Sequence, residues 1–179
     1  MMKMSKKNDE NPECRQPVNA LVRAAATADF DRISAFAQSP EELMYFFPRA
    51  VYPLTPAQLR EAALHRTDAT VVEYEGLAVA YANLYRSEPG GICALGNVVV
   101  APNMRGQGIG RLLAAAMIDC AAAKYRATEI RVACFNRNTA GLLLYPEMGF
   151  IPFAVEERKG IGGERIALIH LRLVLNPAK

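Results

Sequence analysis

The segment NVVVAPNMRGQGIGRLL, residues 97–113, constrains the fold more strongly than any other part of the chain. It begins with β-branched residues, which favour a strand, and a proline then breaks the run. Gly106, Gly108 and Gly110 follow, and an apolar pattern with helical spacing begins at Ile109. The free amides and the dipole at the start of such a helix favour an anion. The segment therefore predicts an anion-binding junction of strand, glycine-rich turn and helix.

Two well-known phosphate-binding loops do not match this turn. A nucleotide-triphosphatase loop ends in Gly-Lys-Ser/Thr, which the segment lacks. The dinucleotide fingerprint Gly-x-Gly-x-x-Gly needs a third small residue. Arg111 holds that place when counted from Gly106, and Leu113 holds it when counted from Gly108. Arg105 and Arg111 add positive charge beside the turn, so we expect a phosphate to bind through a different spacing.

Length and composition indicate one compact domain. The chain has 179 residues, of which 51% are hydrophobic, enough for one well-buried core. The net charge is +3, and no block of Lys or Arg indicates nucleic-acid binding. No apolar run approaches the roughly 18 residues of a membrane helix, and the N-terminus lacks a signal-peptide core. We expect a cytoplasmic protein that binds neither nucleic acid nor a membrane.

The four cysteines are predicted to be reduced thiols. They lie far apart, form no Cys-x-x-Cys pair and have only two histidines to accompany them, so no metal site is expected.

The order of predicted elements gives an α/β domain over residues 18–176, preceded by a disordered arm over residues 1–17. The arm is polar, contains two prolines and has little to bury. The domain is expected to begin with a strand at 21–23, a helix capped near Thr27 or Asp29, and helices beginning near Pro40 and Pro56. Three antiparallel strands over 69–101, a helix from 109, a strand within 128–136, a short helix within 138–150 and a closing hairpin follow. The helix from 109 is expected to bury Ile109, Leu112, Leu113, Ala116, Met117 and Cys120.

Two motifs resemble the GCN5-related N-acetyltransferase (GNAT) family. Residues 105–110 are similar to its Arg/Gln-x-x-Gly-x-Gly/Ala signature, and Val-x-Pro at residues 100–102 precedes them, as in many members. Residues 138–150 are similar to a second family segment. Its matching positions are Asn138, Leu144, Tyr145, Gly149 and Phe150. The resemblance covers residues 19–175 and implies an α/β fold, layered as α+β, with a mixed, mostly antiparallel sheet of about seven strands and helices on both faces.

The resemblance also implies acetyl-CoA as cosubstrate and assigns roles to residues. The pyrophosphate would lie on the amides of Arg105, Gly106, Gln107, Gly108, Ile109, Gly110 and Arg111. Strand backbone at Val98, Val99 and Val100 would contact pantetheine, and the amides of Val98 or Val99 would stabilise the acetyl oxygen. Asn138 would contact the pantetheine arm, and Tyr145 would protonate the departing sulfur. The alternative for Tyr145 is a packing role beside its apolar neighbours.

At the position where many family members carry a general base, this sequence departs from the family pattern. Many relatives carry a carboxylate just before the apolar triplet of the fourth strand, where this chain has Gly96 and Asn97. Glu73, Glu88 and His170 are candidate substitutes, acting directly or through water. An amine that arrives neutral needs no base.

The acceptor site is predicted between the first and second strands. Tyr45, Phe46 and Tyr52 are candidates for its wall, together with Phe47, and Glu73 for a polar contact. The alternative is that these aromatics seal two helices against the sheet. Glu41 and Glu42 could attract an ammonium group, or simply suit a helix N-terminus.

The sequence therefore predicts an N-acetyltransferase that moves the acetyl group of acetyl-CoA to a primary amine of a small molecule or a peptide. A non-catalytic acetyl-CoA sensor is the alternative. A homodimer through the final strands is compatible with either function.

Overall fold

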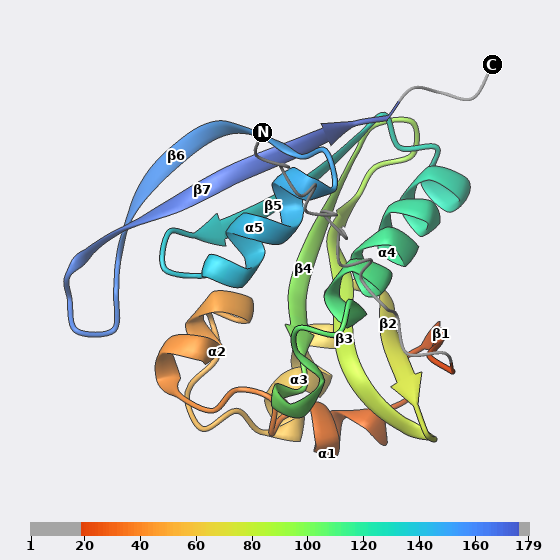
Figure 1. Ribbon diagram of the computed structural model, residues 1–179, viewed down its shortest axis with the longest axis vertical. Helices are drawn as coiled ribbons and strands as arrows, with labels where there is room; N and C mark the ends of the chain where they lie inside the picture. Colours follow the sequence, from red (N-terminus) through yellow and green to blue (C-terminus); the bar gives the residue numbers. More distant parts are fainter. Residues whose placement is uncertain (1–18, 176–179) are drawn as a thin grey trace, which may run out of the picture.

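The computed structural model describes residues 19–175, so the predicted arm over residues 1–17 lies outside the described residues. Figure 1 shows a curved central sheet with helices packed against it. The elements in chain order are β1 (Leu21–Ala24), α1 (Asp29–Ile33), α2 (Pro40–Phe46), α3 (Pro56–Ala63), β2 (Thr67–Tyr74), β3 (Leu77–Ser87), β4 (Ile92–Val100), η1 (Pro102–Met104), α4 (Ile109–Tyr125), β5 (Glu129–Phe135), α5 (Thr139–Glu147), β6 (Ile151–Lys159) and β7 (Arg165–Val174).

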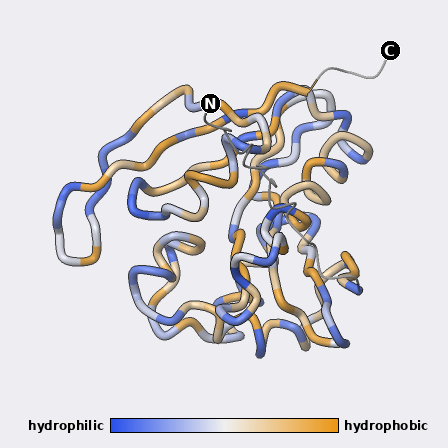
Figure 2. Tube along the Cα trace, in the orientation of Figure 1, coloured by the Kyte–Doolittle hydropathy of each residue, from blue (hydrophilic) through white to orange (hydrophobic). Residues whose placement is uncertain are grey.

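The seven strands form one mixed sheet, as predicted. Their order is β1-β2-β3-β4-β5-β7-β6, and only the pair β4 and β5 is parallel. Every residue of β3 from Ala78 to Leu84 is buried, so both faces of the sheet are covered. Figure 2 shows apolar residues along these strands. No helix within residues 19–175 is long and apolar enough to span a membrane.

The parallel strands β4 and β5 pair only at one end. Their register covers residues 92–94 of β4 and 129–131 of β5, after which the two strands separate (Figure 1). A bulge interrupts the register between β3 and β4, and Asn97 within it has a left-handed backbone with φ +53°. The side of β4 that faces β5 therefore has no strand partner beyond Ala94.

The helix starts largely follow the predicted signals. The side chains of Ser39 and Thr55 accept from backbone amides three residues on, so both cap their helices as their sequences indicate. The expected cap of α1 is wrong, because Ala28 occupies that position without a side-chain bond. Asp29 instead accepts from the amide of Ala26 at 2.7 Å and pairs with Arg23.

The buried face of α4 differs in detail from the predicted one, and the end of α5 is marked by a proline and a glycine. The buried face of α4 follows the row 109, 113, 117 and 121 with Ala114, whereas Leu112, Ala116 and Cys120, also predicted to be buried, are only partly buried. Pro146 lies one residue before the end of α5, so the helix ends directly after it. Gly149, with φ +88°, then ends the segment.

The closing hairpin projects beyond the rest of the sheet (Figure 1). All nine residues of β6 are exposed, including the apolar side chains of Ile151, Phe153 and Val155. Arg137 donates to Glu164 at 2.9 Å, which ties the loop after β5 to the hairpin tip.

Candidate active site

Two cavities meet where β4 and β5 separate. The first, of about 550 Å³, extends along the glycine-rich turn and α5. The second, of about 1080 Å³, lies between the loop after α2, α3 and the closing hairpin. Five residues line both cavities, and these mark the junction: Tyr45, Phe46, Val98, Asn138 and Tyr145. All five were predicted from the sequence as site residues.

The glycine-rich turn presents open backbone amides to the first cavity. Gly106 and Gly108 have φ +74° and +78°, a left-handed conformation that favours glycine. Within the described chain, no backbone bond is donated by the amides of residues 106–108, and the first helical bond of α4 begins at Leu112. The amides of residues 109–111 are likewise left without a helical acceptor. This arrangement suits an anionic group.

Not all of the predicted turn residues behave alike. Gly110 lies within α4 and, unlike Gly106 and Gly108, does not have a positive φ. An added Cβ at Gly110 would lie 3.5 Å from Leu144 and 3.7 Å from Val100, at ordinary contact distance. The side chain of Ile109 is buried in the core, and Gln107 donates to the carbonyl of Asn103 at 3.0 Å. Only the backbone of these last two residues is available to a ligand at the turn.

The two arginines beside the turn are paired with carboxylates rather than free. Arg105 donates to both carboxylate oxygens of Glu42, at 2.9 and 3.0 Å, and to the carbonyl of Phe36 at 3.1 Å. This contact holds the pKa of Glu42 below its usual value. Arg111 pairs with Glu147 on α5. The expected free positive charge is therefore largely compensated within the protein.

Tyr145 presents its phenol at the junction of the two cavities. The side chain is buried, and its ring meets Phe150 edge-on at 5.6 Å between centroids. Its hydroxyl makes no hydrogen bond to any residue in the described range. Burial, assisted by the nearby Cys134, raises the pKa of Tyr145 above its ordinary value. The phenol is therefore protonated at neutral pH and able to donate.

Asn138 is held in place by the helix that it caps. Its Oδ1 accepts from the amide of Gly141 at 3.1 Å, and the residue lines both cavities. Gly141 permits close packing of α5 on β5, because an added Cβ would lie 2.7 Å from Sγ of Cys134. The cap and this contact together fix the position of Asn138.

The bulge of β4 is held by a buried amide network. Asn97 donates through Nδ2 to the carbonyl of Phe46 at 2.9 Å and accepts from Asn83 at 2.9 Å. Asn83 also bonds to the hydroxyl of Tyr81 at 3.0 Å. Neither Asn97 nor Gly96 can accept a proton as a carboxylate would, so Asn97 has a structural role here: it joins the end of α2 to the bulge.

Of the three candidate bases, only His170 lies at the site. His170 lines the second cavity, with Nε2 3.5 Å from Oε1 of Glu156 but without hydrogen-bond geometry. Glu73 pairs with Arg23 at 2.6 Å at the β1 side of the sheet and lines neither cavity. Glu88 pairs with Arg86 at 2.6 Å in the turn between β3 and β4, outside both cavities. The predictions for Glu73 as substrate contact and for Glu73 and Glu88 as bases are therefore not supported by their positions.

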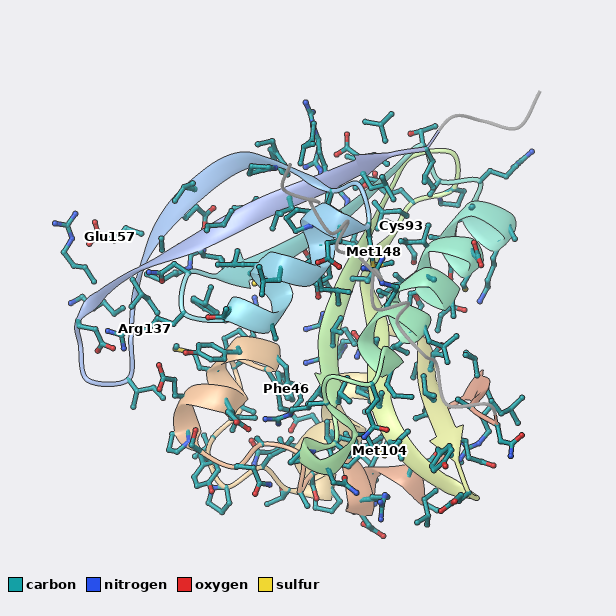
Figure 3. All side chains as sticks on the ribbon, in the orientation of Figure 1. Phe46, Cys93, Met104, Arg137, Met148 and Glu157 are labelled. Carbon is teal, nitrogen blue, oxygen red and sulfur yellow. The ribbon has the colours of Figure 1, made fainter. Side chains whose placement is uncertain are left out.

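The predicted aromatic wall is partly present. Tyr45 and Phe46 line both cavities, and Phe47 lines the second (Figure 3 shows Phe46 between α2 and β4). Phe46 and Phe47 are also buried in the core, so they both seal the helices and form the wall. Tyr52 is 41% exposed and lines neither cavity, so its position does not support its predicted role. It follows α2 by several residues, and the loop carries it to the surface.

The second cavity also contains polar residues that no motif marks. Arg49 follows α2, Glu61 lies on α3, and His65 and Arg66 follow α3. In the sequence these residues look like an ordinary solvated helix surface. Only the tertiary structure brings them together around one cavity.

Comparison with known proteins agrees with this arrangement. The model of the Acetyltransferase (GNAT) family matches residues 19–150. Among proteins with curated descriptions, none matches the sequence. A ribosomal-protein-alanine N-acetyltransferase from Brucella melitensis is 25% identical, with 87% of this chain and 99% of that chain covered and a TM-score of 0.69.

Two further solved structures have the same fold. A Salmonella typhimurium protein described as an acetyltransferase, solved with its cofactor acetyl-CoA, is 24% identical, with 90% and 96% of the two chains covered and a TM-score of 0.68. An N-acetyltransferase from Staphylococcus aureus is 20% identical, with 88% and 99% covered and a TM-score of 0.68.

Proposed function

This chain belongs to the GNAT acetyltransferase family, and on that premise we propose that it transfers the acetyl group of acetyl-CoA directly to a primary amine within a ternary complex. The observation that carries the proposal is the junction of two cavities beside the unpaired edge of β4. One cavity suits the cosubstrate and the other an acceptor. Val98 and Tyr145 lie where they meet.

The first cavity fits acetyl-CoA in its chemistry. The open amides at residues 106–111 suit the pyrophosphate, because they supply several donors and the positive end of the α4 dipole. The backbone of Val98, Val99 and Val100 lies beyond the part of β4 that pairs with β5, so the groups on that side can bond to the amides of pantetheine. Asn138 lines both cavities, and its side-chain amide would contact the pantetheine arm. When bound, acetyl-CoA supplies an acetyl thioester that an amine can attack.

The chain provides donors for the two atoms on which charge develops. The amides of Val98 and Val99 would stabilise the acetyl oxygen as it becomes negative. Tyr145 would give its proton to the departing sulfur and recover one from solvent afterwards. The proton released by the amine would leave through the second cavity, where His170 is the nearest of the predicted acceptors to the opening.

A non-catalytic acetyl-CoA sensor is the second candidate. The replacement of a strand carboxylate by Gly96 and Asn97 favours it, whereas the protonated phenol of Tyr145 at the junction favours catalysis. The two candidates differ in one measurable quantity. Only an enzyme releases free thiol from acetyl-CoA in proportion to acetylated amine.

The experiment is a thiol-release assay with acetyl-CoA and a panel of amino acids, polyamines, aminoglycosides and peptide N-termini. We expect at least one amine to accelerate thiol release, with the acetylated product seen by mass spectrometry. Calorimetry with acetyl-CoA is run in parallel. Binding without transfer to any amine would favour the sensor.

We also propose that the exposed edge strand β6 joins two copies of the chain. Ile151 and Val155 are 54% and 66% exposed on it, and apolar edge strands of this kind favour pairing. Sedimentation at several concentrations tests this proposal. The variant Val155→Lys should remain monomeric at concentrations where the wild type associates.

A further inference from the structure

Arg66 stands out among the cations of the second cavity because it is partly buried and yet has no acidic partner. Arg49 and Lys159 also form no ion pair within residues 19–175, but both are exposed. Within residues 19–175, no carboxylate lies within 4 Å of the guanidinium of Arg66, which also donates no hydrogen bond to protein. By contrast, Arg158 at the same cavity pairs with Glu156. Arg66 is only partly exposed and lies over the ring of Tyr85, 5.3 Å from its centroid.

The absence of a side chain at Gly96 makes room for this guanidinium beside β4. A Cβ added to Gly96 would lie 3.0 Å from Nη1 of Arg66 and equally close to Oδ1 of Asn83. That oxygen is buried and has no hydrogen-bond partner of its own. Gly96 precedes Val98 by two residues, a span of at most about 7 Å along a strand. The charge of Arg66 is thus held close to the junction of the two cavities.

The charge around Arg66 is predominantly positive. Arg49, Arg66, Arg158 and Lys159 line the second cavity, and Glu61 is the only acidic residue among the described residues that line it. Removal from water is costly for a cation without a counter-charge. Here burial, and to a smaller extent Arg49, lower the pKa of Arg66. A bound anion would compensate this charge, as Glu42 does for Arg105.

We propose that Arg66 binds an oxyanion of the acceptor, so that the amine acetylated by this protein also carries a carboxylate or a similar group. This inference rests on the proposed acetyl transfer. The planar guanidinium matches a carboxylate with two parallel hydrogen bonds, and Arg49 adds charge at the cavity rim. The short distance from Gly96 to Val98 suits a small amino acid, with its carboxylate at Arg66 and its amine at the junction.

A binding experiment tests this inference without requiring turnover. Calorimetry compares N-acetyl-L-leucine with its C-terminal amide, each titrated into protein saturated with CoA. We expect the wild type to bind the acid at least about tenfold more tightly than the amide, equivalent to about 1.4 kcal/mol. This ratio should fall to near one in Arg66→Gln and recover partly in Arg66→Lys. Equal affinities in the wild type, or an unchanged ratio in Arg66→Gln, would overturn the proposal.

The matched control is Arg86→Gln, which removes an arginine that pairs with Glu88 outside both cavities. It should keep the wild-type preference for the acid. The affinity of Arg66→Gln for acetyl-CoA should equal that of the wild type and thereby show that the variant is folded. An N-acetyl aminophosphonate in the same titration distinguishes a carboxylate from a phosphonate. The ligand that binds more tightly identifies the class of oxyanion that Arg66 prefers.

Turnover separates this inference from the proposed function. If leucine and leucinamide are acetylated with equal kcat/KM, acetyl transfer stands and the role of Arg66 is refuted. If no amine is acetylated while binding of the acid still depends on Arg66, acetyl transfer is refuted and the oxyanion site stands.

Discussion

Arg105 and Glu42 form a two-pronged ion pair, with both carboxylate oxygens within 3.0 Å of guanidinium nitrogens. The pair joins the N-terminal turn of α2 to the residue that begins the glycine-rich turn. Both residues line the first cavity, so the pair also sets the charge beside the proposed pyrophosphate site. Substitution of Arg105 and substitution of Glu42 should therefore change the affinity for acetyl-CoA to different extents.

Arg105→Gln should weaken acetyl-CoA binding by about tenfold, because it leaves the carboxylate of Glu42 uncompensated beside a phosphate. Glu42→Gln should change the affinity much less, since it removes the repulsive member. Calorimetry on both variants measures this. Equal losses would show that the pair acts by positioning α2 and not through its charge. Because both side chains are about a third or more exposed, global stability should change by less than about 1 kcal/mol.

Gly108→Ala should lower acetyl-CoA affinity by about tenfold through the strained backbone and the methyl group at the turn. The control is Gly76→Ala, at a turn with nearly the same φ, +76°, far from both cavities. Both variants should lose about 1–2 kcal/mol of folding free energy, as measured by urea unfolding. Only the first should bind acetyl-CoA poorly. A similar loss of affinity in both would remove the glycine-rich turn from the binding site.

Tyr145→Phe should reduce kcat by about 100-fold or more while leaving acetyl-CoA affinity nearly unchanged, as expected for loss of a general acid. Tyr74→Phe, which lines neither cavity, is the matched control. The pKa of Tyr145 lies above its ordinary value of 10.0. Between pH 7 and pH 9, kcat should therefore not fall through deprotonation of Tyr145. Unchanged turnover in Tyr145→Phe would leave the residue with a packing role alone.

Asn97→Ala should destabilise the fold by about 2–4 kcal/mol, because it removes two buried hydrogen bonds and leaves the carbonyl of Phe46 without a donor. Asn97→Gly loses the same bonds but suits the backbone at φ +53°, so it should be less destabilised. Urea unfolding measures both. If Asn97→Gly proved the less stable, the left-handed conformation would not be a source of strain.

The Arg23 and Asp29 pair should stabilise the protein in a pH-dependent way. Arg23 bonds to Asp29 at 2.7 Å and holds its pKa below the ordinary value of 3.8. A lowered pKa in the folded state gives stability that is present above about pH 4 and is lost as the pH falls through the folded-state pKa. Arg23→Gln should therefore be less stable than the wild type at pH 7, and the difference should shrink towards pH 2. A difference independent of pH would point to packing instead.

Local chemistry determined most of the element boundaries and the position of the glycine-rich turn. The β-branched run before Pro102, the capping residues Ser39 and Thr55, and the glycines at 106 and 108 each act over a few residues, so they can be read without tertiary information. Asn138 and Tyr145 were predicted through the resemblance to the GNAT family, and their spacing along one short helix brings both to the opening.

Only the tertiary structure decided which charges are free and which are paired. Arg105 and Glu42 are 63 residues apart in the sequence, and Glu73 meets Arg23 across 50 residues, so no local pattern could identify these partners. Tyr52 lies outside the cavities for the same reason: the path of a loop depends on what it packs against. Arg66 lines the second cavity because the fold brings the end of α3 close to β4, where Gly96 leaves the space for it. Short-range sterics and capping thus set the elements, whereas long-range packing and desolvation set the electrostatics of the site.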